Sequence, residues 1–145
     1  MGPMTQTRTL RNSLVLMLLS AVAGCSTTGG GDRHPAPQLR AVTLTPEAST
    51  VWLTAASIGT IEPIGSCVYF VTGSGQRLLA LWPDGFELER KDGVAVGVRY
   101  TRTGKGVAFG TTHTFGSGAL SALPGSLADP LPADCSGPAT MLWFD

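Results

Sequence analysis

Residues 67–82, CVYFVTGSGQRLLALW, decide the fold. The apolar run Cys67–Thr72 is joined by a glycine-containing loop, residues 73–76, to a second apolar run at residues 78–82. Two short runs of this kind around such a loop are typical of a β-hairpin. The first run is apolar on both faces, so we expect it to be a central strand of a sheet.

Strand signals continue after the Pro-Asp-Gly turn at residues 83–85. Phe86 and Leu88 alternate with Glu87 and Glu89, and we place the two glutamates on the solvent face. The next turn is Asp-Gly, a dipeptide favoured in two-residue hairpins. The best period-two pattern in the chain then begins, and one face of that strand is formed by Val94, Val96, Val98 and Tyr100.

The N-terminal side of this region carries weaker signals. Residues 39–44 alternate weakly and indicate a strand, whereas residues 46–57 fit either a short helix or an irregular strand. We expect Gly59 and the Pro-Ile-Gly sequence at residues 63–65 to break the chain before the main β region.

The C-terminal part is predicted to be mostly loop with two strands. Residues 107–110 indicate a short strand. Residues 116–132 are rich in Gly, Ser, Leu and Pro and predict irregular structure with one helical turn at residues 117–123. The apolar residues 139–144 predict a closing strand. Five or six short strands with tight turns favour an all-β fold, a small five- or six-stranded OB-like barrel or a strongly curved sheet.

The N-terminus has the composition of an export signal. Arg8 and Arg11 precede an apolar run, residues 14–23, that only Ser20 interrupts. A helix of that length would span about 15 Å, whereas a bilayer core is about 30 Å thick. The run therefore fits the apolar region of a signal peptide and is too short for a membrane-spanning helix.

Residues 22–25, Val-Ala-Gly-Cys, resemble the lipobox of bacterial lipoprotein precursors. The resemblance implies that residues 1–24 are a signal peptide, that cleavage falls between Gly24 and Cys25, and that Cys25 carries a thioether-linked diacylglycerol. Two or more acyl chains anchor a protein stably, at about 0.8 kcal/mol per buried CH₂. An ordinary secretory signal with a chance cysteine is the alternative.

The membrane that would hold this anchor depends on the cell. Ser26, not Asp, follows the lipidated position. In a diderm, similarity to known sorting signals implies the outer membrane. In a single-membrane bacterium the anchor lies in the outer leaflet of the cell membrane.

Residues 25–40 are predicted to be the lipidated cysteine and a flexible tether, because Ser, Thr, Gly and Pro dominate them. We assign the folded β domain to residues 41–145. The whole chain has no net formal charge, but residues 41–145 hold six Lys or Arg and nine Asp or Glu, a net charge of −3. That net charge gives no electrostatic reason to expect binding to nucleic acid or to an anionic membrane surface.

Acylation of Cys25 leaves Cys67 and Cys135 as an even pair in an oxidising compartment, which predicts a disulfide. The bond would close a loop of 68 residues, and in the chain-entropy treatment that is worth about 4 kcal/mol. Two free thiols or a metal-binding pair are the alternatives. No CxxC pair and no histidine at ligand spacing supports a metal, and no cofactor is expected.

Four features of the C-terminal part occur together: Cys67 in the first core strand, Trp82-Pro83 followed by Gly85, a glycine-rich middle, and Pro132-x-x-Cys135 before an apolar terminal strand. In these features the chain resembles a class of small envelope lipoproteins from high-GC bacteria. The resemblance implies an OB-like barrel and no particular chemistry.

Candidate catalytic residues are sparse. His113 is the only histidine in the folded domain, and a hydrolase would need it as base beside Ser117 and either Asp84 or Asp129. No nucleophile-elbow pattern GxSxG accompanies it, and an exposed loop histidine is the default interpretation. Paired carboxylates are no better supported, because the two glutamates of residues 86–90 share one solvent face.

Two groups of residues are candidates for a binding surface. Trp52, Trp82 and Trp143 suit either a sugar site or the core, and the core is the commoner place for them. OB-type barrels also bind oligonucleotides or oligosaccharides on surfaces with basic residues. Here the basic residues gather around two adjacent turns, although charge that only confers solubility is the commoner explanation: Arg90, Lys91, Arg99, Arg102 and Lys105.

We therefore expect a lipid-anchored envelope protein that acts as a non-catalytic binding or adaptor module. Its expected partners are the membrane, through the anchor, and an envelope protein or wall polymer, and not nucleic acid. The alternative is a small hydrolase that acts on envelope material with His113 as base.

Overall fold

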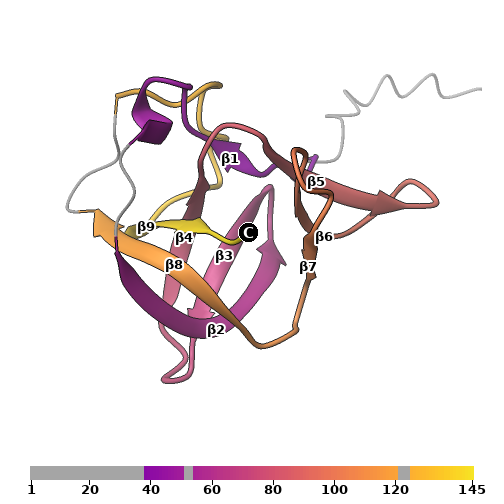
Figure 1. Cartoon of the computed structure of the whole chain (residues 1–145), viewed down its shortest axis with the longest axis horizontal. Coiled ribbons are helices and arrows are strands. Elements are labelled where there is room, and N and C mark those ends of the chain that lie inside the picture. Colours follow the sequence, from indigo (N-terminus) through magenta and orange to yellow (C-terminus); the bar gives the residue numbers. More distant parts are fainter. Residues whose placement is uncertain (1–37, 51–53, 121–124) are drawn as a thin grey trace, which may run out of the picture. The chain divides into compact units, whose positions relative to one another are not determined.

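The computed structural model describes residues 38–50, 54–120 and 125–145, so the predicted signal peptide, the lipobox and Trp52 lie outside the described residues. The described part is built almost entirely from strands (Figure 1). Its elements are β1 (Val42–Thr43), the 3₁₀ helix η1 (Ala48–Thr50), β2 (Ala55–Ile64), β3 (Cys67–Thr72), β4 (Arg77–Trp82), β5 (Phe86–Lys91), β6 (Val94–Tyr100), β7 (Gly106–Ala108), β8 (His113–Leu120) and β9 (Ala139–Trp143).

Five strands close into a barrel in the order β2-β3-β4-β9-β8, with β8 returning to β2. Neighbouring strands are antiparallel except β4 and β9, which run parallel with Leu79 opposite Ala139. The predicted hairpin of residues 67–82 forms β3 and β4, two neighbouring strands of the barrel wall. The closed five-stranded arrangement confirms the prediction of a small OB-like barrel.

Strand β2 is long because it serves two neighbours. Its first half pairs with β8 and its second half with β3, and Gly59 belongs to both ladders. A Cβ atom at Gly59 would overlap the carbonyl oxygen of Val71. The expected break is therefore wrong for Gly59, where the glycine allows two backbones to approach closely, and for Pro63, which lies inside β2. It is correct at Gly65, which has a positive φ in the turn between β2 and β3.

Strand β8 corrects a second expectation. Residues 116–120 belong to an eight-residue strand, where irregular structure and a helical turn were predicted. Gly116 faces Trp143 across the β8–β9 ladder, and a Cβ atom there would overlap the indole ring. Small residues that lower intrinsic strand propensity are thus required by the neighbouring side chain.

Strands β5, β6 and β7 form a separate three-stranded sheet inserted between β4 and β8 (Figure 1). The Asp92-Gly93 turn joins β5 to β6, with positive φ at both residues, as expected for a two-residue hairpin. The register shifts by one residue between Glu89 and Arg90, which leaves Val96 as an extra residue in β6. This bulge breaks the predicted alternation, so Val98 is fully buried whereas Val94 is 65% exposed.

The residues from 46 to 57 contain both predicted alternatives in part. Thr45 caps the 3₁₀ helix, because its hydroxyl accepts the Ala48 N–H at 3.4 Å, and strand β2 begins at Ala55. The weak strand predicted at residues 39–44 is present as β1, which pairs in parallel with the end of β4.

Two apolar clusters lie on opposite sides of the barrel wall. The interior is filled by Ile61, Val68, Phe70, Ala80, Trp82, Phe115, Leu142 and Phe144, with Phe86, Val98 and Val107 entering from the inserted sheet. The outer cluster contains Val42, Leu44, Cys67, Tyr69, Leu79, Leu81, Cys135, Ala139 and Met141. Because β3 and β4 contribute to both clusters, they are apolar on both faces, as their sequence indicates.

Candidate functional site

The outer face of β3, β4 and β9 is covered by the chain itself. Two segments lie over it, the N-terminal segment (residues 39–50) and the covering loop (residues 125–138). They pair with each other: Leu44 bridges Leu127, and the Ala128 N–H donates to the Thr43 carbonyl at 2.9 Å. In OB-type barrels the face around the second and third strands commonly binds the ligand. Here that face is a second core.

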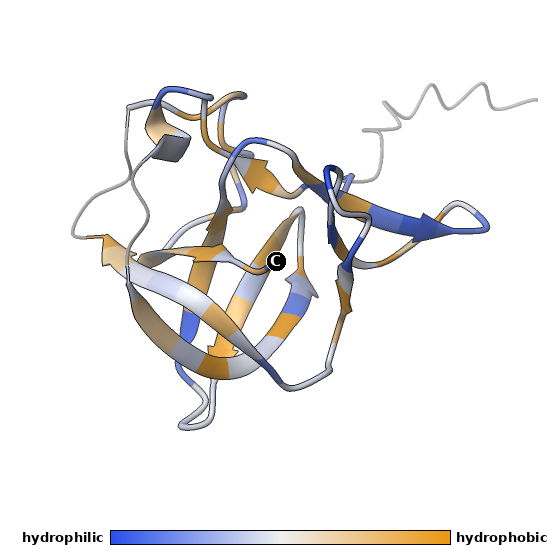
Figure 2. Ribbon diagram, in the orientation of Figure 1, coloured by the Kyte–Doolittle hydropathy of each residue, from blue (hydrophilic) through white to orange (hydrophobic). Residues whose placement is uncertain are grey.

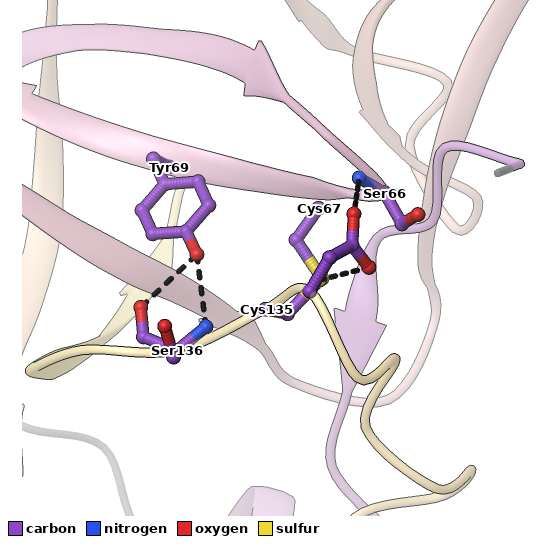
Figure 3. The surroundings of a disulfide bond; sticks show 6 residues. Ser66, Cys67, Tyr69, Cys135 and Ser136 are labelled. Atoms are coloured by element: carbon purple, nitrogen blue, oxygen red, sulfur yellow. Dashed lines mark hydrogen bonds between the residues drawn. A yellow bond between two sulfur atoms is a disulfide. The ribbon is translucent and has the colours of Figure 1, made fainter.

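A disulfide joins the covering loop to the barrel (Figure 3). Cys67 at the start of β3 bonds to Cys135, with a Cα–Cα distance of 5.9 Å, as the cysteine count predicted. Beside it the Tyr69 hydroxyl donates to the Ser136 carbonyl at 3.0 Å and accepts the Ser136 N–H at 3.1 Å. The loop is therefore held by one covalent bond and a pair of hydrogen bonds.

Asp134 adds a charged contact at the same place. Its Oδ2 accepts the Ser66 backbone N–H at 2.8 Å, at the turn between β2 and β3. The Ser66 hydroxyl is the main cause that lowers the pKa of this carboxylate below the ordinary 3.8. Desolvation opposes it, and the backbone N–H groups of Ser66 and Asp134 lower the pKa by smaller amounts. The contact ties the covering loop to the turn between β2 and β3.

The structure does not bring together the residues of the hydrolase alternative. His113 is exposed at the start of β8, where its ring packs 5.1 Å from that of Phe115. Ser117 lies four residues further along the same strand, about 13 Å away at strand rise, and its hydroxyl bonds to Ser57 Oγ at 2.6 Å. Asp84 lies in the β4–β5 turn and Asp129 in the covering loop.

The acidic residues of β5 take the places that the alternation predicted. Glu87 is exposed and forms an ion pair with Arg99, its partner across the β5–β6 ladder, through Arg99 Nε at 2.8 Å and its second guanidinium nitrogen. Glu89 lies on the same face, with its carboxylate over Gly106. The two carboxylates share one face of the strand, so they do not oppose each other across a cleft as a catalytic pair would.

The tryptophans within the described part are structural. Trp82 is fully buried in the barrel interior, where its ring lies 5.5 Å from Phe86 and 6.1 Å from Phe144. Trp143 is half-buried over Gly116. Trp82 therefore has no open aromatic face for a sugar, and Trp143 packs against both apolar clusters, so both follow the core interpretation.

The basic residues are the predicted candidates for a binding surface that remain after the catalytic residues and the tryptophans. Arg99 is paired with Glu87, and the other members of the predicted cluster lie in or near the turns of the inserted sheet: Arg90, Lys91, Arg102 and Lys105. Sequence reasoning did not include Arg40 in this cluster. The fold places Arg40 on the N-terminal segment, in the lining of the same groove as Arg90. Only the topology reveals this, because the two residues are 50 positions apart.

That groove has a volume of about 510 Å³. The N-terminal segment forms one side and β5 the other: Leu39, Arg40, Ala41, Thr43, Phe86, Glu87, Leu88 and Arg90, with Asp129 from the covering loop. A smaller pocket of about 290 Å³ lies near η1 and contains Asp84, Tyr100 and Arg102.

Comparisons with known families, curated proteins and solved structures gave no match. Within residues 38–50, 54–120 and 125–145, no three His, Cys, Asp or Glu side chains gather in a way that could hold a metal ion. No helix in this described part is long and apolar enough to cross a membrane. The fold and its surfaces thus define a closed, disulfide-bonded OB-like barrel whose usual ligand face is covered.

Proposed function

We propose that the protein is a lipid-anchored envelope lipoprotein that acts as a non-catalytic binding or adaptor module. The export signal and the Val-Ala-Gly-Cys sequence ending at Cys25 support the anchor. The Cys67–Cys135 disulfide is consistent with an oxidising compartment. The partner of such a module would be an envelope protein or a wall polymer.

One observation supports a binding surface over an internal site. The barrel interior is filled with aromatic side chains, and the outer face of β3, β4 and β9 lies under the chain's own segments. A ligand therefore has to bind on the outer surface, where the hollows are shallow. Surfaces of this kind suit a macromolecular partner better than a small molecule, which is usually enclosed in a deep pocket.

The experiment combines mass spectrometry of the N-terminus with capture of partners. Protein extracted in detergent from its native host should begin at Cys25 and carry acyl chains, and its partners should be recovered from the envelope fraction. A Cys25→Ala variant is the matched control, because it alters no described residue. A mature N-terminus without acyl chains, or a soluble Cys25→Ala protein with full function in cells, would contradict the proposal.

A further inference from the structure

We propose that the β5–β6 hairpin and the groove at its base bind the headgroups of anionic phospholipids in the leaflet that holds the anchor. This inference rests on the proposed lipid anchor and adds a second contact between the domain and the membrane. The anchored domain would then lie against the bilayer in one orientation, and its opposite side would face the partner.

The groove has the composition of a headgroup site. Arg40 and Arg90 are exposed on its two sides, and Leu39, Phe86 and Leu88 form apolar parts of its lining. Neither arginine forms an ion pair with an acidic residue of the described part. Guanidinium groups bind phosphate oxygens in a bidentate manner, so each side of the groove offers one cation to headgroup phosphates.

The tip of the hairpin has the composition of an interfacial contact. Lys91 and Val94 face each other as the last pair of the β5–β6 ladder, and Val94 is one of the two most exposed large apolar side chains in the described part. Arg90 Nη1 donates to the Gly93 carbonyl at 3.1 Å, which holds the arginine beside the turn. The hairpin projects beyond the barrel, with polar residues along β5 (Figures 1 and 2). Basic residues beside an exposed aliphatic one are typical of membrane-surface segments.

The acidic residues near this surface leave the basic charge available. Glu87, which lines the groove, is neutralised by Arg99, and Glu89 lies over Gly106 and is not among the lining residues. Asp92 at the hairpin turn and Asp129 at the rim of the groove oppose three basic side chains, those of Arg40, Arg90 and Lys91. The domain's net charge of −3 therefore does not describe this local surface.

The position of the groove favours a membrane over a soluble anion. Leu39, the first groove residue, lies 14 residues after Cys25. A flexible chain of that length has a root-mean-square reach of about 20 Å. Anchoring therefore keeps the groove at a high effective concentration of headgroups, at which even a weak interaction is populated.

The test compares two vesicle compositions with the acylated protein. Protein whose acyl chains have been verified by intact mass is reconstituted into phosphatidylcholine vesicles and into vesicles that also contain phosphatidylglycerol. We expect amide hydrogen exchange in residues 38–41 and 90–95 to slow only where phosphatidylglycerol is present. Each basic side chain near an anionic surface changes the affinity about fivefold, so Arg90→Glu or Arg40→Glu should weaken docking on the order of 25-fold and remove the protection.

Arg77→Glu is the matched control. Arg77 is also an exposed arginine on a strand, but it lies beside the β3–β4 turn, away from the β5–β6 hairpin (Figure 1). Its variant should keep the protection, and thermal melts check that all three variants fold. Equal protection in both vesicle types would overturn the proposal, as would equal loss in Arg77→Glu or protection that needs an added anionic wall polymer. A missing acyl chain at the mass step would instead contradict the proposed function.

Discussion

Glycine at position 59 lets one strand take part in two ladders. Its Cα faces Thr72 on one side and His113 on the other, and a side chain would meet the Val71 carbonyl and the Phe70 ring. The Val71 oxygen belongs to the backbone of a barrel strand, so it has little freedom to move away. The constraint is therefore steric and does not come from an unusual φ.

Gly59→Ala should destabilise the barrel by about 1–3 kcal/mol, the usual range for overpacking in a well-filled structure. Gly73→Ala is the matched control, because a Cβ atom there meets nothing within 4 Å. It should change stability by less than about 0.5 kcal/mol. Urea unfolding monitored by tryptophan fluorescence measures both. Equal effects of the two substitutions would show that the barrel relaxes around the added methyl group.

At the scale of elements, the sequence predicts the strands whose signal is local. Strands β3 and β4 carry long apolar runs, and the turn at residues 92–93 has a dipeptide whose conformation is largely its own. The sequence does not predict strands β2 and β8, because their glycines are required by contacts with other strands. Gly59 lies against the Val71 carbonyl, and Gly116 lies against the Trp143 ring. Pro63 adds to the difficulty. It is tolerated because the ladder with β8 ends at Gly59, so no residue of β8 pairs with Pro63.

The same limit applies to the candidate site. The disulfide followed from the cysteine count and the expected compartment, both of which the sequence carries. The covering of the β3–β4 face did not, because it depends on pairing between Leu44 and Leu127, 83 residues apart. The groove with Arg40 and Arg90 depends on the same long-range arrangement. Surfaces built from distant segments leave no periodic pattern in the sequence.

The covering loop should respond to acid through Asp134. Its pKa is lower in the folded protein than the ordinary 3.8. The unfolded chain therefore takes up the proton first as the pH falls, and the stabilisation present above pH 4 is lost as the pH drops through the folded pKa. Asp134→Asn should lack this acid-dependent loss. Melting temperatures measured between neutral pH and pH 2 test the difference.

Asp129→Asn is the control for this prediction, since Asp129 is on the same loop and makes no side-chain hydrogen bond to another described residue. It should keep the acid-dependent slope of the wild type. If Asp134→Asn and the wild type lose stability in parallel below pH 4, the Ser66 hydrogen bonds do not hold the carboxylate in solution.

At the scale of the whole molecule, the described part of the chain contains two apolar cores separated by one sheet of strands. Strands β3, β4 and β9 face the aromatic interior on one side and the covered cluster on the other. Burial of both faces explains how a small domain with no α-helix in its described part forms an extensive core. It also means that the covering segments are part of the folded unit, so the disulfide that holds them should affect global stability.

Removing the disulfide tests this directly. The Cys67–Cys135 bond closes a loop of 68 residues, which corresponds to about 4 kcal/mol of unfolded-state entropy. A Cys67→Ala/Cys135→Ala variant should lose up to that amount in urea unfolding, and a reductant should destabilise the wild type comparably while leaving the variant unchanged. Because the covering segments pack on the barrel wall, the transition should stay a single cooperative step. If the covering loop instead gained rapid hydrogen exchange while the barrel kept its full stability, the outer layer would be an appendage and the two-layer interpretation of the core would be wrong.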